Sequence, residues 1–503
     1  TQDRTGPRLT VTVPAPNART TSPYLLAQGT ASDNTRLTAL EYSHNGGPFL
    51  EITGAVAAAE WSIPLTLTAG TNTLEVRALD DSGNVTTVSR RFVRAALEPL
   101  LLVVQGPGTI DGVPGDRLFE VGRRYTLTAN PGLGANFAYW SGDFVSALPQ
   151  LSFVMQPDLI LHAIFVTNRF YPAQGTYYGI IQVASSPNNA LESGWGRFTL
   201  NDRGAYSALW QMPGSRFALS GMLDAKGNIS SSIALEAGIL RPVYFNVDLD
   251  DTETMSGSLP LPGGRTGFLL AYRAQFYNPS NPSPYQARYT WNDLQGNRPA
   301  GGASFGTVVI DQSNLATLTA FLADGTRFIQ RTPLSRQGWW PIYSEASRGG
   351  VFAGWLQTLA SPTNTPALVS SNLLWVRLPN LRASRYPTGF ADYVSLLGDR
   401  YEAPLNPLEP VLDFHTAEWI ASGESWQTSI PVSLLPGNLM ASDPPGTLSA
   451  RFDVKQGLLS GTFVAPDGRP RRFQGAIDQP SQSASGYFLE KTASGWFDVH
   501  AKH

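Results

Sequence analysis

The fold class is decided by GRFTLNDRGAYSALWQMPGSRFALSG, at residues 196–221. Polar and apolar residues alternate in three short runs, and Asn, Asp, Gly or Pro separates one run from the next. Alternation with a period of two is typical of a half-buried strand, and those four residue types favour tight turns. The stretch therefore predicts three antiparallel strands joined by two turns.

Two later stretches repeat this pattern: GTVVIDQSNLATLTAFLADGTRF at 306–328 and ARFDVKQGLLSGTFVAPDGRPRRFQG at 450–475. Their second turn contains Asp-Gly, where the first stretch has Pro-Gly. Asp-Gly favours a type I′ hairpin turn, in which both central residues have positive φ. We therefore expect residues 169–503 to form one continuous β-region of related meanders, barrel-like, with a split into two subdomains near 380–400 as the alternative.

Composition supports an all-β chain. Its 503 residues include 48 Gly and 38 Pro, and only 15% are charged, which excludes a helical bundle or a coiled coil. The net charge is −3 and no long stretch is basic, so we expect no nucleic-acid partner. No apolar run approaches the ~18 residues of a membrane helix, so we expect no membrane insertion.

The N-terminal region, residues 1–96, contains short alternating runs that predict a β-sandwich. GTASDN at 29–34, a strand leading into NGG, and AGTNTLEVRALDDSGN at 69–84 resemble bacterial Ig-like modules of secreted and surface proteins. That resemblance implies an immunoglobulin-like sandwich and an extracellular or cell-surface location. The chain begins at Thr1 rather than methionine, which fits removal of a signal peptide.

Residues 97–168 change in character. GPGTI at 106–110, TLTANP at 126–131, FAYWSGD at 137–143 and the closing FVM at 153–155 resemble the divergent InlB B-repeat type of bacterial surface module. The resemblance implies a small β-rich spacer or contact module in which Trp140 belongs to the core. With the C-terminal region, these modules are typical of a modular secreted bacterial surface protein.

Catalytic motifs are weak, so we expect no enzyme activity. There is no cysteine, and the five histidines are dispersed along the chain. GASFG at 302–306 matches the G-x-S-x-G nucleophile elbow, but a predicted strand follows Ser304 where the elbow needs a helix. The cluster of Asp248, Asp250, Asp251 and Glu253 supplies carboxylates for a glycoside hydrolase, which is one alternative function.

Two loops of the sandwich form a candidate calcium site. Asp33 lies in one loop, and Asp80, Asp81 and Asn84 lie in another that the sandwich brings toward the same pole. Oxygen ligands from acidic loops suit calcium. The alternative is that both loops are ordinary turns, which favour the same residue types, and then there is no cofactor.

Polysaccharide binding is a further alternative function. Adjacent strand residues point to opposite faces, so one ring of Trp339-Trp340 is expected to face outward, and we assign Trp339 as a candidate for stacking on sugars. Most other tryptophans are expected in the core.

The principal hypothesis is a non-catalytic, extracellular, surface or fibre-forming adhesive protein that associates with itself head to tail. Only four lysines guard strand edges along the chain, and none precedes Lys226. The strand that contains Arg8, Leu9, Val11 and Val13 lies close to the chain start and could add to the sheet of a neighbouring copy. The alternative is that it is the first strand of its own sandwich.

Overall fold

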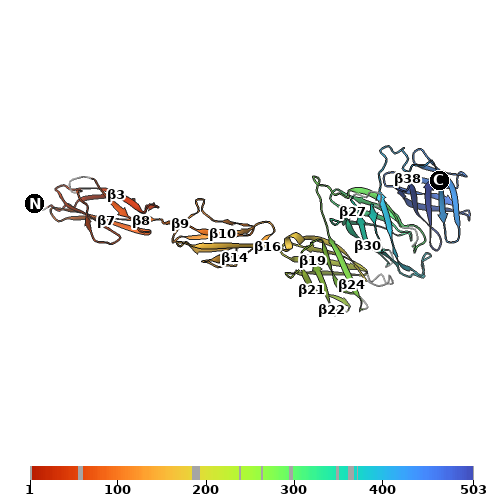
Figure 1. The fold of residues 1–503 in the computed structure, drawn as a ribbon, viewed down its shortest axis with the longest axis horizontal. Coiled ribbons are helices and arrows are strands. Elements are labelled where there is room, and N and C mark those ends of the chain that lie inside the picture. Colours follow the sequence, from red (N-terminus) through yellow and green to blue (C-terminus); the bar gives the residue numbers. More distant parts are fainter. Residues whose placement is uncertain are drawn as a thin grey trace. The chain divides into compact units, whose positions relative to one another are not determined.

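The computed structural model describes residues 3–54, 60–183, 193–236, 239–261, 264–293, 298–346, 350–360, 367–370 and 372–501. The chain is all-β, as predicted: strands β1–β42 and a single-turn helix, α1 (Phe170–Ala173), are the regular elements of these residues (Figure 1). Within them, no helix has the length and apolar character needed to cross a membrane. The chain divides into two compact units, Thr1–Asn168 and Arg169–His503.

Two sheets make the N-terminal part of the first unit. Alternating side chains of both sheets meet in one core, which includes Trp61, Leu74, Val76 and Phe92. The first sheet has the order β1-β3-β6, with β1 (Arg8–Val13), β3 (Tyr24–Ser32) and β6 (Glu60–Thr66). The second has the order β2-β8-β7-β4-β5, with β2 (Arg19–Thr20), β8 (Val85–Arg94), β7 (Gly70–Asp80), β4 (Leu37–His44) and β5 (Leu50–Glu51).

The remainder of the first unit has its own core. Trp140 is completely buried there beside Phe137, which confirms its predicted core position. Three small sheets surround this core: β12 (Leu118–Glu120) with β9 (Leu97–Pro99); β10 (Leu101–Gln105), β16 (Ile160–Thr167) and β14 (Ala135–Gly142); and β11 (Gly108–Asp111), β13 (Arg124–Pro131) and β15 (Gln150–Val154).

The second unit begins with an up-and-down barrel that is open at one seam. Its sheet order is β20-β19-β18-β17-β24-β23-β22-β21, so consecutive strands are paired except β20 and β21, and β17 pairs with β24. Its core includes Tyr177, Trp210 and Phe245. The strands are β17 (Gly175–Gln182), β18 (Gly194–Leu200), β19 (Ala205–Met212), β20 (Ser215–Met222), β21 (Asn228–Glu236), β22 (Ile239–Val247), β23 (Thr254–Pro260) and β24 (Thr266–Arg273).

The second sheet of this unit is also open at one place, between β28 and β29, which are not paired with each other in the described residues. The side-chain amide of Gln330 on β28 bridges it, donating to the Pro341 carbonyl and accepting from the Tyr343 N–H, both at 2.9 Å. The order is β28-β27-β26-β25-β34-β31-β30-β32-β33, with β29 paired to β30. The strands are β25 (Ala287–Asp293), β26 (Phe305–Ile310), β27 (Leu315–Phe321), β28 (Arg327–Pro333), β29 (Trp339–Ala346), β30 (Gly350–Thr358), β31 (Leu368–Val369), β32 (Leu373–Arg377), β33 (Phe390–Val394) and β34 (Leu396–Arg400).

The last sheet is a closed barrel, β35 to β42, in which each strand pairs with the next and β42 pairs with β35. Aromatic rings of Trp419, Phe463, Phe473 and Phe497 fill its interior. The strands are β35 (Thr416–Ser422), β36 (Gln427–Leu435), β37 (Leu439–Ser442), β38 (Leu448–Asp453), β39 (Leu458–Val464), β40 (Pro470–Asp478), β41 (Ser483–Leu489) and β42 (Ser494–Ala501).

The three repeated stretches are meanders, as predicted: β18-β19-β20, β26-β27-β28 and β38-β39-β40 each pair in chain order. Residues 169–503 form one compact unit, and within it the meanders lie in three separate sheets. The second sheet extends through β33 and β34, so the closed barrel begins after the 380–400 segment that the alternative proposed as a boundary. A division between β24 and β25 was not foreseen.

The type I′ turn prediction is also wrong. Gly325 and Gly468 have φ of 90° and 77°, but neither preceding aspartate is among the residues with positive φ. In the first of these loops, the Gly325 N–H donates to the Leu322 carbonyl at 2.9 Å and the Leu322 N–H donates to the Thr326 carbonyl at 2.8 Å. This is a three-residue loop with one left-handed glycine, the next most common hairpin connection after the two-residue turn.

Candidate functional site

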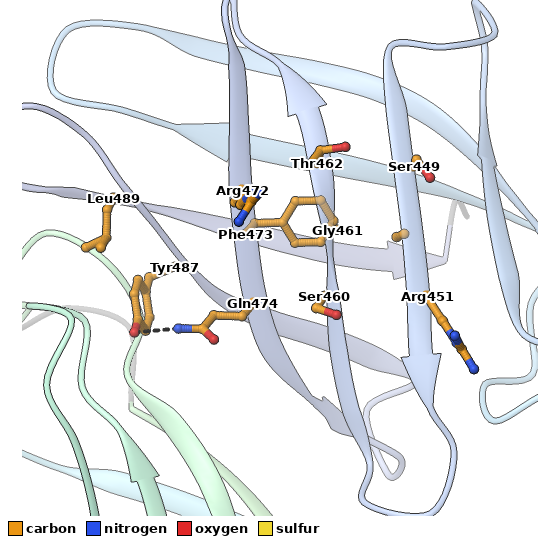
Figure 2. Close-up of a pocket in the computed structure, with 11 residues that line it drawn as sticks. Ser449, Arg451, Ser460, Gly461, Thr462, Arg472, Phe473, Gln474, Tyr487 and Leu489 are labelled. Atoms are coloured by element: carbon orange, nitrogen blue, oxygen red, sulfur yellow. Dashed lines mark hydrogen bonds between the residues drawn. The ribbon is translucent and has the colours of Figure 1, made fainter.

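A polar groove of about 610 Å³ lies on the outer face of the closed barrel (Figure 2). It is formed by strands β38, β39, β40 and β41, whose inward side chains pack the barrel core. Its lining residues are Ser449, Ala450, Arg451, Ser460, Gly461, Thr462, Arg472, Phe473, Gln474, Tyr487 and Leu489.

The register of the strands explains why these side chains converge. Residues that are paired across antiparallel strands point to the same face, and the next residue but one along each strand points there too. Two adjacent cross-strand rows therefore make the groove. One row is Ser449, Thr462, Arg472 and Leu489, and the other is Arg451, Ser460, Gln474 and Tyr487.

One end of the groove is rigid. The Gln474 amide donates to the Tyr487 hydroxyl at 2.6 Å, and the Tyr487 ring lies 5.8 Å from the Phe305 ring of the second sheet. Burial raises the pKa of Tyr487 to about 12, so its hydroxyl stays protonated at neutral pH. Figure 2 shows Arg451 at the opposite end of the groove from Tyr487.

The groove is rich in hydrogen-bonding groups. Among the residues that the structure describes, its lining offers two guanidinium groups, three hydroxyl side chains, an amide and a phenol, and neither a carboxylate nor a histidine. Glycoside hydrolysis needs two opposed carboxyl groups, and general acid–base catalysis at neutral pH usually relies on histidine or a tuned carboxyl.

The sequence predicted none of these groove residues. The signal was the alternation of polar residues in the third meander, Ser449 and Arg451 on β38 and Ser460 and Thr462 on β39. The pairing register, which brings the rows together, is a property of the folded barrel.

The candidate catalytic motifs take structural positions. Ser304 is buried immediately before β26, a strand, as predicted, and its hydroxyl accepts from the Ala323 N–H at 3.1 Å. Its own N–H donates to Asp293, a buried carboxylate that pairs with Arg298 at 3.2 Å. Burial raises the pKa of Asp293 to about 7.

The acidic cluster at 248–253 does not form an opposed pair. The Asp248 carboxylate accepts from the N–H groups of Asp250 and Asp251, which lowers its pKa as in an ordinary turn. Glu253 is instead buried and pairs with Arg273 at 2.7 Å.

The two loops of the predicted calcium site do meet, but the three carboxylates that converge differ from the predicted set. Carboxylate oxygens of Asp3, Asp33 and Asp80 lie within 4.8 Å of one another, so two predicted residues converge and Asp3 joins them. Asp81 is outside this set, and the Asn84 amide lies beside it, donating to the Asp80 carboxylate at 2.7 Å. Asp3 was missed because it precedes the first strand and no local pattern fixes its position.

Hydrogen bonds hold the cluster from several sides. Asp80 accepts from the N–H groups of Ser82 and Asn84, which is the pattern of an Asx turn. Asp33 accepts twice from Thr35 through one oxygen, and its other oxygen is buried with no hydrogen-bond partner among the described residues. The turn alternative explains the Asp80 geometry, and calcium binding stays a prediction.

If calcium binds between these loops, chelation is expected to lower the melting temperature of the sandwich. A ligand at 100 times its Kd stabilises the folded state by about 2.7 kcal/mol, which corresponds to a shift of roughly 10 °C or more for a module of this size. Calorimetry with calcium or excess chelator measures the shift. Asp33→Asn should abolish the calcium dependence, whereas Asp116→Asn should preserve it; an identical wild-type transition in calcium and chelator would contradict the prediction.

The Trp339 ring is not fully available for stacking on a sugar, because it already contacts another aromatic ring. Its ring stacks on Tyr272 of β24, with centroids 5.8 Å apart and planes at 11°. Trp340 points the other way, is 1% exposed and donates to the Thr358 hydroxyl at 3.1 Å. The side chains do alternate, but the outward ring packs against the neighbouring sheet and has one face covered.

The proposed assembly strand, β1, belongs to its own sandwich. Arg8, Leu9, Val11 and Val13 are all in register with β3, with a bulge between Val11 and Val13. Val11 is 5% exposed and lies in the core. In the described part of the first unit, the other edge of β1 has no strand partner.

Comparisons with known proteins do not identify the chain: no family model and no curated protein sequence matches it. Among solved structures, a 1.5-MDa bacterial ice-binding adhesin has 8% identity and a TM-score of 0.16, covering 65% of this chain and 97% of that one. The Bacteroides ovatus glucan-utilization protein SGBP-B, in complex with a mixed-linkage heptasaccharide, has 10% identity and a TM-score of 0.15, covering 58% and 83%. Transferrin binding protein B from Neisseria meningitidis has 8% identity and a TM-score of 0.17, covering 78% and 86%. With TM-scores this low, these similarities carry no argument about function.

Proposed function

We propose that this protein is a non-catalytic, extracellular adhesive protein that binds a polysaccharide through the groove on its closed barrel. The observation that carries the proposal is the lining of the groove, in which hydrogen-bonding side chains converge, with no carboxylate or histidine among the lining residues that the structure describes. Concave sites with a few convergent polar groups are typical of ligand binding. The sandwich and the small β-module would act as spacers.

Filling the groove tests the proposal. Ser460 is exposed on β39 in the centre of the groove, so Ser460→Trp should block the groove without disturbing the barrel core. We expect binding to a polysaccharide identified on a glycan array to fall at least about tenfold, or 1.4 kcal/mol. The matched control is Ser429→Trp, because Ser429 is exposed on β36 outside the groove.

Two results would contradict the proposal. One is a complete absence of glycan binding by the wild-type protein. The other is release of new reducing ends from the bound polysaccharide, which would establish a hydrolase.

Self-association is a second candidate function, favoured by exposed sheet edges. Edge strands with unpaired N–H and C=O groups can add a strand from another copy. In the described residues, β1 is an edge strand, and β20 and β21 are unpaired edges at the open seam.

Light scattering over a range of concentrations should then show growth beyond a monomer. Thr12→Lys on β1 should reduce this growth, because a lysine on an edge strand opposes pairing. Gln28→Lys places the same charge on β3, an interior strand, and is the control. A wild-type protein that stays monomeric at high concentration would exclude self-association.

A further inference from the structure

We propose that the groove takes an acidic polysaccharide, whose carboxylate or sulfate groups are held by Arg451 and Arg472. The inference rests on the proposed function and specifies the class of ligand. It comes from the placement of the two arginines, from the absence of an ion-pair partner for either one among the described residues, and from the neutral groups between them.

The two arginines lie diagonally across the groove. Arg451 is on β38 and Arg472 is on β40, two strands away and in the neighbouring cross-strand row. With ~4.8 Å between strands and ~3.4 Å per residue, their Cα atoms are about 12 Å apart. Two anionic groups on one extended polysaccharide chain can reach both guanidinium groups at this separation. The two arginines therefore do not have to come close together, which would cost energy because their charges repel.

Neither arginine has a carboxylate partner among the described residues. In the part of the chain that the structure describes, Arg451 and Arg472 are exposed and no carboxylate lies within 4.0 Å of either guanidinium group. The adjacent Arg471, in contrast, pairs with Asp467 at 2.8 Å. Guanidinium stays charged at all working pH values and forms bidentate hydrogen bonds with carboxylate or sulfate oxygens.

Neutral donors and acceptors fill the space between the two charges. Ser460 and Thr462 lie on β39, between the strands of the two arginines, and Gln474 lies beside Ser460 on β40. Hydroxyl and amide groups both donate and accept, as the hydroxyls of a sugar require. The aromatic residues of the lining, Phe473 and Tyr487, are buried, so the groove offers no exposed ring on which nucleic-acid bases could stack.

The test measures binding of the 503-residue chain to four polymers: polygalacturonate, dextran sulfate, neutral dextran and duplex DNA. We expect binding to one of the acidic polysaccharides, weakened by added salt because screening reduces the attraction of exposed charges. The two acidic polymers distinguish carboxylate from sulfate as the group recognised. Arg451→Gln and Arg472→Gln should each weaken binding by about tenfold or more, and the double variant by about 100-fold.

Arg471→Gln is the matched control, because it removes the same charge from the same strand outside the groove, and it should leave binding within about twofold of wild type. Neutral dextran binding as tightly as the acidic polymers, with no effect of the arginine variants, would overturn the acidic ligand and leave the proposed function standing. Equal effects of all three arginine variants would also overturn it, and so would tighter binding to duplex DNA. Failure of all four polymers to bind, together with an empty glycan array, would overturn both proposals.

Discussion

Replacing Trp419 by alanine is expected to destabilise the closed barrel by about 3–5 kcal/mol, because removing a large buried side chain leaves a cavity. Trp419 is completely buried, and its ring lies 4.4 Å from Phe463, 5.6 Å from Phe473 and 5.9 Å from Phe497. These rings come from β39, β40 and β42, so the variant removes contacts that join β35 to three other strands of the barrel. Hydrogen exchange of the barrel amides, or a calorimetric transition assigned to the barrel, measures the loss.

A conservative variant separates packing from hydrogen bonding. In the part of the chain that the structure describes, the buried Trp419 indole nitrogen has no hydrogen-bond partner. Trp419→Phe therefore sacrifices no hydrogen bond, and it should cost much less than the alanine variant. Similar losses of stability in Trp419→Phe and Trp419→Ala would contradict this expectation. They would show that the barrel depends on the indole itself and not on a buried aromatic ring at this position.

Trp419→Ala is also expected to affect ligand binding in the groove. Phe463 and Phe473 point inward from the strands whose outward residues, Thr462 and Arg472, line the groove. Partial unfolding of these strands would disperse the two cross-strand rows. Trp419→Ala is therefore expected to weaken ligand binding in proportion to the fraction of unfolded barrel.

Local structure was largely predictable from the sequence. Alternation and turn residues located the three meanders, because a strand with one buried face must alternate and a tight turn needs Gly, Asn or Asp. The division into sheets was not predictable in this way. Whether β20 pairs with β21, or β24 with β17, depends on contacts between residues that are distant in the sequence.

The candidate site residues were likewise predictable from the sequence only where local pattern determines their position. Asp33 and Asp80 were identified because each lies in a polar loop at the end of a strand, and the sandwich brings these loops together. Trp339 alternates with Trp340 as expected, but the position of Tyr272 on another sheet decides whether its ring is free. Arg451 takes part in the polar alternation of the third meander, but that alternation does not single it out together with Arg472, because surface arginines on strands are ordinary until the register aligns them.

Replacing Asp324 by alanine is expected to destabilise the second sheet by about 3–5 kcal/mol, because it leaves the charge of Arg377 buried without a partner. The Asp324 carboxylate and the Arg377 guanidinium lie 2.5 Å apart, and their side chains are 3% and 11% exposed. Arg377 also lies over the ring of Tyr386, whose hydroxyl donates to the Ala300 carbonyl at 2.7 Å. The loss would therefore loosen several connections around the β27–β28 loop.

The third meander supplies a matched control for this prediction. Asp467 occupies the position equivalent to that of Asp324, in a three-residue loop of the same type in the third meander. It also pairs with an arginine, Arg471, but its side chain is 41% exposed. Because water and salt screen an exposed pair, Asp467→Ala should have a far smaller effect than Asp324→Ala. In the double variant Asp324→Ala, Arg377→Met, part of the stability should return, since no unpaired charge remains buried. Equal losses at the two loops, measured by denaturant unfolding, would show that the turn rather than the buried charge pair determines the stability.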